Sequence, residues 1–165
     1  MINYMKKRIF IILICILMNT ITAFTSNKDR LELANLTVQY CNLLSNREFS
    51  KLINLLDSKF SVNGIINFEN RRDILNFFKK VYGTSNQLIE LDEISILNHQ
   101  DIVKINSKLK EKLFHGINSL TNSDWITLIY KIKINGEINS SNIILIFKRK
   151  SNGWLIKGMY SKDLL

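Results

Sequence analysis

The sequence predicts an α+β domain in which three N-terminal helices pack on a curved antiparallel sheet of about five to six strands. Two observations carry this prediction. Apolar residues recur with a helical period up to Gly83 and alternate with polar residues after it. Two Asn-Gly pairs, at positions 135–136 and 152–153, then separate the alternating segments, as such pairs do in β-hairpins.

A leader precedes the predicted domain. Three basic residues at positions 6–8 are followed by the apolar run Ile9–Met18 and then by a polar stretch with small residues. This order is typical of a secretory signal peptide, with cleavage expected near Ala23. The apolar run is about half as long as a membrane-spanning helix requires. We therefore predict that residues 1–23 are a signal peptide and that residues 24–165 form one domain, which is secreted, or periplasmic in a bacterium.

Composition and cysteine usage agree with a single globular domain. Apolar residues make up 46% and charged residues 22% of the chain, which is too apolar for a disordered protein. The formal charge of +9 falls to +6 without residues 1–23, because that segment carries three basic residues and no acid. Cys41 then remains without a disulfide partner. We interpret it as a small buried hydrophobe, since it lies in an apolar helical stretch.

The first predicted helix covers Lys28–Ser45, where leucines and Tyr40 recur at helical spacing and amides mark the opposite face. Ser45 and Glu48 form a capping-box pattern, so a second helix is expected to begin there. A short strand, Lys59–Asn63, is expected to follow that second helix.

Asn70 and Asp73 are expected to open the third helix, and Gly83 to end it in a left-handed conformation. The sheet follows. Its predicted strands are Gln87–Leu97, Asp101–Leu113, Trp125–Ile134, Ile143–Arg149 and Trp154–Tyr160. The row expected to face the core comprises Val103, Ile105, Leu109, Ile126, Leu128, Tyr130 and Ile132.

Three segments and their order carry a resemblance to a known superfamily. They are Phe49–Gly64 (FSKLINLLDSKFSVNG), Asp73–Gly83 (DILNFFKKVYG) and Ile144–Tyr160 (ILIFKRKSNGWLIKGMY). The chain resembles the nuclear-transport-factor-2-like superfamily, which includes ketosteroid isomerases, scytalone dehydratases and polyketide cyclases of the SnoaL type. The resemblance covers about Leu31–Tyr160 and implies a cone closed by helices and sheet. Because enzymes, carriers and scaffolds share this fold, it implies no single function.

The resemblance to ketosteroid isomerases suggests one catalytic constellation. Those enzymes use an inward Asp as base and hold an oxyanion with a Tyr and a protonated Asp. Tyr40, Asp57 and Tyr130 are the candidates here. The alternative is that both tyrosines fill the core and Asp57 ends a helix. His99 and His115 are expected in turns, so the histidine chemistry of scytalone dehydratases is not expected.

Other chemistry finds no support in the sequence. Two distant histidines and one thiol do not compose a zinc site, so no metal is expected, and no cofactor motif is present. The predicted function is a secreted or periplasmic binding or interaction module, which could hold a small apolar ligand in the cone. The alternative is a lyase or isomerase of the ketosteroid isomerase kind. The aromatic side chains expected to line the cone are Tyr40, Phe60, Phe78, Tyr82, Tyr130 and Trp154.

Surface features suggest further partners. The strand Ile143–Phe147 is apolar on both faces, which would permit a homodimer through the sheet. A lysine-bearing sheet face could attract an anionic surface, or could simply be solvated and block edge-to-edge aggregation. Its lysines are Lys104, Lys108, Lys110, Lys112, Lys131, Lys133, Lys148 and Lys157. Nucleic acid is not expected, because aromatic residues do not alternate with these lysines. Sequons at Asn35 and Asn139 are candidate glycosylation sites in a eukaryotic source.

Overall fold

The structure of this chain is a computed structural model that describes residues 27–84, 89–105, 120–121 and 123–161. The predicted signal peptide lies outside these ranges. The chain divides into two compact units, Met1–Glu32 and Leu33–Leu165. In the first unit, residues 27–32 are helical. The second unit holds the sheet and the cores described below.

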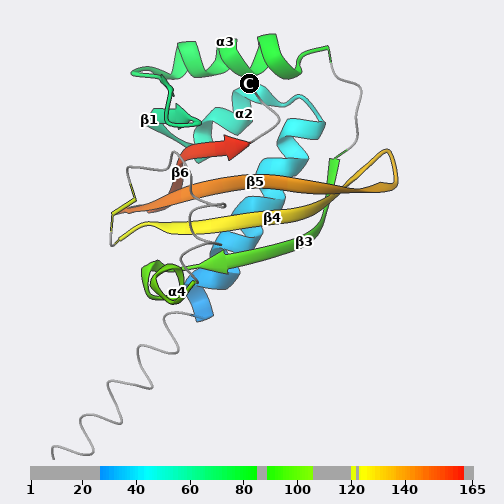
Figure 1. Cartoon of the computed structure of the whole chain (residues 1–165). Helices are drawn as coiled ribbons and strands as arrows, with labels where there is room; N and C mark the ends of the chain where they lie inside the picture. Colours follow the sequence, from blue (N-terminus) through cyan, green and yellow to red (C-terminus); the bar gives the residue numbers. More distant parts are fainter. Residues whose placement is uncertain (1–26, 85–88, 106–119, 122, 162–165) are drawn as a thin grey trace, which may run out of the picture. The chain divides into compact units, whose positions relative to one another are not determined.

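Within the described ranges, the second unit is an α+β fold on one six-stranded sheet of order β2-β1-β6-β5-β4-β3 (Figure 1). The strands are β1 (Leu56–Val62), β2 (Ile66–Asn67), β3 (Ile89–Leu97), β4 (Trp125–Ile134), β5 (Glu137–Lys150) and β6 (Gly153–Ser161). The prediction of an antiparallel sheet is wrong at one pair, because β1 runs parallel to β6. A parallel pair needs a long crossover, and here everything between the first and last strands supplies it.

The helices of the described part of this unit are residues 33–45, α2 (Phe49–Leu52), α3 (Arg71–Tyr82) and α4 (His99–Lys104). Residues 33–45 are amphipathic as predicted: Leu33 and Tyr40 are buried, while Asn35 is exposed. The second helix is a single turn that continues into the 3₁₀ turn Ile53–Leu55. No helix in the described ranges has the length and apolar character needed to cross a membrane.

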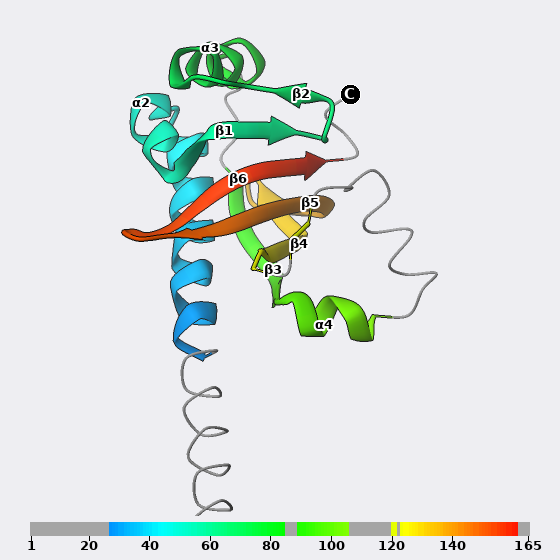
Figure 2. The same ribbon diagram turned by 90° about the vertical axis from the view of Figure 1, so that its left-hand side faces the viewer.

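Both faces of the central sheet are apolar, and different elements lie against them. Figure 2 shows the helix of residues 33–45 on one side of β4 and β5, and α4 on the other. The main core lies on the side of the long helix and includes Ile129, Ile132, Leu145, Phe147, Trp154, Ile156 and Met159. A second cluster combines Ile102 of α4 with Ile126, Leu128, Ile144 and Ile146. Burial on both faces explains why residues 143–147 form an unbroken apolar run.

Register shifts bend the sheet and change which side chains face the main core. The pairing of β4 with β5 shifts between Ile129 and Lys131, and the pairing of β3 with β4 shifts near Glu93. Ile129 and Ile132, three residues apart, therefore both join the main core, which strict alternation forbids. Tyr130 is left 37% exposed. The predicted inner row is thus wrong in part: Ile132 does join the main core, but Ile126 and Leu128 pack on the opposite face.

One predicted strand is largely a helix where it is described. Residues 99–104 form α4, whereas a turn and the start of the strand Asp101–Leu113 were expected there. The cause is a capping box, in which the Asp101 backbone N–H donates to Asn98 Oδ1 at 2.9 Å and the Asn98 N–H donates back to Asp101 Oδ2 at 3.0 Å. Val103, expected in the core, is 60% exposed on this helix. Residues 106–113, and with them Leu109, lie outside the described ranges.

The predicted caps had mixed outcomes. Asn70 does cap α3, since its Oδ1 accepts the Asp73 backbone N–H at 3.0 Å. Ser45 does not open α2; instead its hydroxyl donates to the Ile89 carbonyl and accepts the Ile89 N–H, both at 2.9 Å, which ties the helix to the first residue of β3. Gly83 is not left-handed either, with φ at −64°.

The first hairpin turn has the backbone that its sequence predicts. Asn135 and Gly136 have φ values of 52° and 87°, as a type I′ turn requires. The β4–β5 hairpin therefore forms where the sequence places it.

Candidate functional site

Tyr40, a candidate catalytic residue, lies inside the main core. Its hydroxyl donates to the Met159 sulfur at 3.4 Å, so the contact joins the long helix to β6. Burial raises the pKa of Tyr40 well above its ordinary value, and the nearby Tyr82 and Cys41 raise it further. The phenol keeps its proton, but its one hydrogen-bond donor is used by the thioether and is not directed at the site of an oxyanion.

The aromatic residues expected to line a pocket are largely in contact with one another. The ring centroid of Phe78 lies 6.5 Å from that of Tyr40, 6.0 Å from that of Phe60 and 5.8 Å from that of Tyr82. Phe60 and Phe78 have no exposed surface. An empty space the size of a water molecule beside these rings would leave part of them uncovered. The cone is therefore filled by side chains at this level.

Trp154 is the remaining buried member of the expected lining. It is 5% exposed, its ring meets that of Trp125 edge-on at 6.0 Å, and the Arg149 guanidinium lies 5.2 Å from its centroid. Its indole N–H is buried without a hydrogen-bond partner among the described residues. Tyr130, exposed at the bulge, is separate from this group.

Asp57, the candidate base, lies at the start of β1 and not at a helix end. Its Oδ2 is 3.2 Å from Lys150 Nζ, and the Ser58 hydroxyl donates to Oδ1 at 3.3 Å. Burial raises the pKa of Asp57, but the hydrogen bond and charge of Lys150, together with hydrogen bonds from the Lys59 backbone and the Ser58 hydroxyl, lower it below its ordinary value. Such a carboxylate is a weaker proton acceptor than a free one.

The structure does not assemble the three catalytic candidates into one site. Tyr40 contacts Met159, Asp57 is paired with Lys150, and Tyr130 is exposed at the register shift of β4. Within the described ranges, no hydrogen bond, ion pair or ring contact joins any two of the three. His99 begins α4 and His115 lies outside those ranges.

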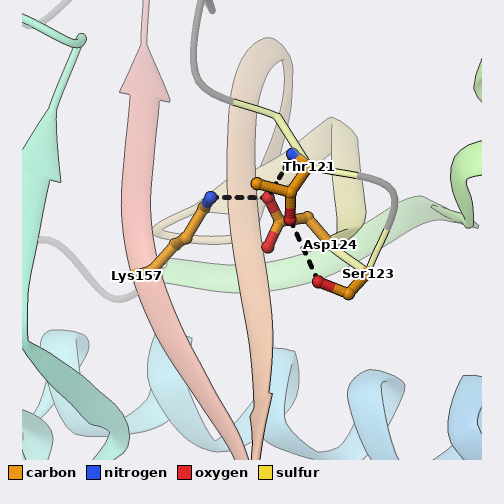
Figure 3. Close-up of polar contacts among 4 residues, drawn as sticks. All are labelled: Thr121, Ser123, Asp124 and Lys157. Carbon is orange, nitrogen blue, oxygen red and sulfur yellow. Dashed lines mark hydrogen bonds and ion pairs between the residues drawn. The ribbon is translucent and has the colours of Figure 1, made fainter.

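A buried ion pair that the sequence analysis missed lies at the start of β4 (Figure 3). The Asp124 carboxylate is 1% exposed, and its Oδ2 lies 2.5 Å from Lys157 Nζ of β6. The same oxygen accepts the Thr121 backbone N–H at 2.7 Å. Thr121 and Ser123 share a hydroxyl hydrogen bond of 3.0 Å. Asp124 Oδ1 is buried without a hydrogen-bond partner among the described residues.

This cluster fixes the end of the connection that leads into β4. The Asp124 N–H donates to the Thr121 carbonyl at 3.0 Å, and this backbone bond closes a tight turn. The Asp124 carboxylate accepts the Thr121 N–H in the same turn and also reaches across to Lys157 of β6. The spacing of Thr121 and Asp124 is that of a capping motif, which was the one available sequence signal. Nothing in the sequence indicated that Lys157, which alternates with core residues of β6, would turn inward to meet it.

The lysines of the sheet are mostly neutralised. Lys131 lies 2.7 Å from Glu93, Lys133 lies 3.7 Å from Asp92, and Lys157 pairs with Asp124. Lys104 and Lys148 are exposed, and the other lysines of the predicted basic face, at positions 108, 110 and 112, lie outside the described ranges. Among the described residues, three of the lysines that could have attracted an anionic surface are therefore paired with acids of the chain.

The remaining candidates are a metal site, Cys41 and the two sequons. Among the described residues, no group of His, Cys, Asp and Glu could hold a metal ion. Cys41 is buried, and burial raises the pKa of its thiol to about 12. The sequon asparagines are both exposed: Asn35 lies on the long helix, and Asn139 lies on β5, where its amide donates to the Glu137 carbonyl at 2.9 Å.

Comparisons with known proteins identify the fold. No protein-family model matches the chain, and no curated protein matches it in sequence. Among solved structures, the chain is similar to an NTF2-like protein with a cystatin-like fold from Novosphingobium aromaticivorans, with a TM-score of 0.51, 14% identity, and coverage of 88% of this chain and 89% of that one.

Two further proteins of the same organism are similar. A candidate aromatic ring hydroxylase matches with a TM-score of 0.53 and 14% identity, over 84% of this chain and 90% of that one. A candidate scytalone dehydratase matches with a TM-score of 0.52 and 10% identity, over 84% and 85%. At these identities the likeness shows the fold alone: the chain has the nuclear-transport-factor-2-like fold, as its sequence predicts.

Proposed function

We propose that this chain, which has the nuclear-transport-factor-2-like fold, is a secreted, non-catalytic interaction module whose cone is a packed core. One observation carries the proposal. Phe60 and Phe78 have no exposed surface, and the Tyr40 hydroxyl is hydrogen-bonded to Met159 across the interior. A carrier or an enzyme of this shape needs an accessible space in the cone. With the cone filled, binding falls to the outer surface.

The polar groups of the interior support the same proposal. Thr37 and Thr127 are both fully buried; the Thr37 hydroxyl donates to the Leu33 carbonyl at 2.8 Å and lies within hydrogen-bond distance, 3.3 Å, of the Thr127 hydroxyl. Neither threonine ionises near neutral pH. The candidate base Asp57 lies in β1, where the ion pair with Lys150 at the end of β5 favours its ionised form.

A small apolar ligand is the second candidate function, and a different observation favours it. Apolar side chains along the edge strand β3 pack against the main core but are only partly covered, as are leucines of the long helix. They are Leu36, Leu43, Leu44, Ile89, Leu91, Ile94 and Ile96. A ligand held here would lie beside the aromatic cluster. The lyase or isomerase alternative would need an acid–base pair that the described interior does not supply.

Native and denaturing mass spectrometry of the protein from its own secretory route tests the proposal. We expect no ligand mass in the native state. Phe78→Ala serves as the positive control, because removing a fully buried ring leaves a cavity that can admit a small aromatic molecule such as benzene. Saturable binding of benzene by Phe78→Ala but not by the wild type supports a packed cone. A ligand that co-purifies with the wild type and gives nuclear Overhauser effects to Phe60 or Tyr40 would overturn it.

A further inference from the structure

The outward face of α3 carries a patch of cations that the predicted basic face did not include. Arg71, Arg72, Lys79 and Lys80 are all exposed on this helix. Arg71 donates to Asn54 Oδ1 at 3.3 Å. Within the described part of the chain, none of the four has an acidic partner. This contrasts with the lysines of the sheet, most of which are paired with an acid.

The acid nearest to this patch in sequence is already engaged. Asp73 lies in the first turn of α3 and accepts a hydrogen bond from the Asn70 side chain at 2.7 Å, while its backbone N–H is capped by the same residue. Glu69, just before the helix, is 3.9 Å from Lys59. Asp73 keeps its charge and is exposed beside Arg72, so the outward face formed by Arg72, Asp73, Lys79 and Lys80 carries a net charge of +2.

The cations of the patch are spread across the surface of α3 and do not form a single row along it. Successive residues of a helix point about 100° apart; since Ile74 and Phe78 point inward, Arg72, Lys79 and Lys80 lie within about 60° of the outward line of α3. Arg71 lies toward the core side of the helix, where it donates to Asn54. Arg72 and Lys80 are about 12 Å apart along the axis. In Figures 1 and 2, α3 is the outermost element on its side of the second unit, with α2, β1 and β2 beneath it. A flat partner can thus meet Arg72, Lys79 and Lys80 together.

The aromatic residues of α3 face away from the patch. Phe78 is fully buried, and Phe77 and Tyr82 pack against the core. Recognition of single-stranded nucleic acid relies on aromatic side chains exposed among the cations. Because these rings are inside, the patch offers charge without stacking, which suits phosphate head groups.

We propose that the outward face of α3 is a docking surface for an anionic lipid bilayer. Contact would be electrostatic and superficial, because the apolar side of the helix is committed to the core. The inference does not depend on the cone being filled. A cation near an anionic bilayer contributes roughly fivefold to partitioning, so three cations would contribute roughly a hundredfold.

Co-sedimentation with phosphatidylcholine vesicles, with and without phosphatidylserine, tests the proposal on the full secreted chain. The wild type is expected to bind only the phosphatidylserine vesicles and to be released by salt. The triple variant R72Q/K79Q/K80Q should lose roughly a hundredfold in partitioning. The matched control K131Q/K133Q/K148Q removes the same charge from the sheet and should remain within a few-fold of the wild type.

Three outcomes would overturn the proposal. They are no wild-type binding at low salt, equal losses in the two triple variants, and binding of heparin without binding of vesicles. The third would assign the patch to an anionic glycan. Circular dichroism checks that each variant is folded, which is expected because the substituted side chains of α3 are exposed and Gln is a good helix former.

Discussion

Replacing Lys157 with methionine should be among the most destabilising single changes on the sheet. The substitution keeps most of the side-chain volume and removes the ammonium that lies 2.5 Å from Asp124 Oδ2. Asp124 is 1% exposed, so its charge would stay buried with the Thr121 N–H as its remaining donor. Removing one partner of a buried pair typically costs about 3–5 kcal/mol. We expect about 3 kcal/mol, because Lys157 retains 18% exposure and water can approach from its side.

Two further variants separate the contribution of the ion pair from that of each side chain alone. Asp124→Asn should cost less than Lys157→Met, because the partly exposed ammonium can reach water whereas the carboxylate cannot. The double variant should then be more stable than the sum of the two single changes implies, by about 2 kcal/mol. Urea unfolding at constant pH supplies all the free energies of unfolding. Lys131→Met removes an exposed lysine of the sheet and should leave stability within error of the wild type.

A small effect would refute this reasoning. If Lys157→Met costs less than about 1 kcal/mol, the pair contributes no more than an exposed one. If the two single costs add in the double variant, the side chains do not interact and the 2.5 Å contact is not populated in solution.

Three further experiments test other parts of the structure. The pKa of Asp57 is lowered in the folded protein, with Lys150 the main favourable cause, so the unfolded state binds the proton more tightly. Asp57→Asn should therefore be less stable than the wild type at about pH 6 and equally stable near pH 2, where the wild-type carboxyl is protonated. Urea unfolding at the two pH values measures this difference. Cys41, whose thiol has a pKa of about 12, should react with a thiol reagent in urea and not in the folded protein; fast labelling of the folded protein would contradict its burial. Gly136→Ala should lower the free energy of unfolding by about 1–2 kcal/mol, because φ is 87° at this position. An added Cβ would meet no neighbour, so the backbone conformation is the whole cause. Thermal unfolding measures the change, and a neutral result would mean that the turn changes type.

Local patterns predicted the elements well where each residue's surroundings are set by its neighbours in sequence. The helical stripe that includes Leu33 and Tyr40, the Asn70 cap and the Asn135–Gly136 turn all formed as expected. Alternation failed at Tyr130, because a register shift depends on how β3, β4 and β5 fit together. The Asn98–Asp101 capping box was present in the sequence and was overlooked, since the surrounding residues alternate as in a strand.

The candidate site was harder to predict than the fold. Tyr40, Phe60 and Phe78 were expected to line the cone and lie in the main core, yet the sequence does not say whether a cone is open or filled. That depends on how closely rings from three different elements approach, and those distances exist only after folding. The Asp124–Lys157 pair joins the residue before β4 to a residue of β6, 33 positions away, so no local pattern reports it.

By itself, the sequence determined the α+β class, the order of most elements and the resemblance to the nuclear-transport-factor-2-like superfamily. These follow from hydrophobic periodicity and turn chemistry, which act over a few residues. Only the tertiary structure decided which lysines are neutralised, where positive charge remains on α3 and that aromatic rings fill the cone at Phe78. Such properties depend on pairs of side chains from distant segments, and the energies of burial and ion pairing are fixed by their separation in space.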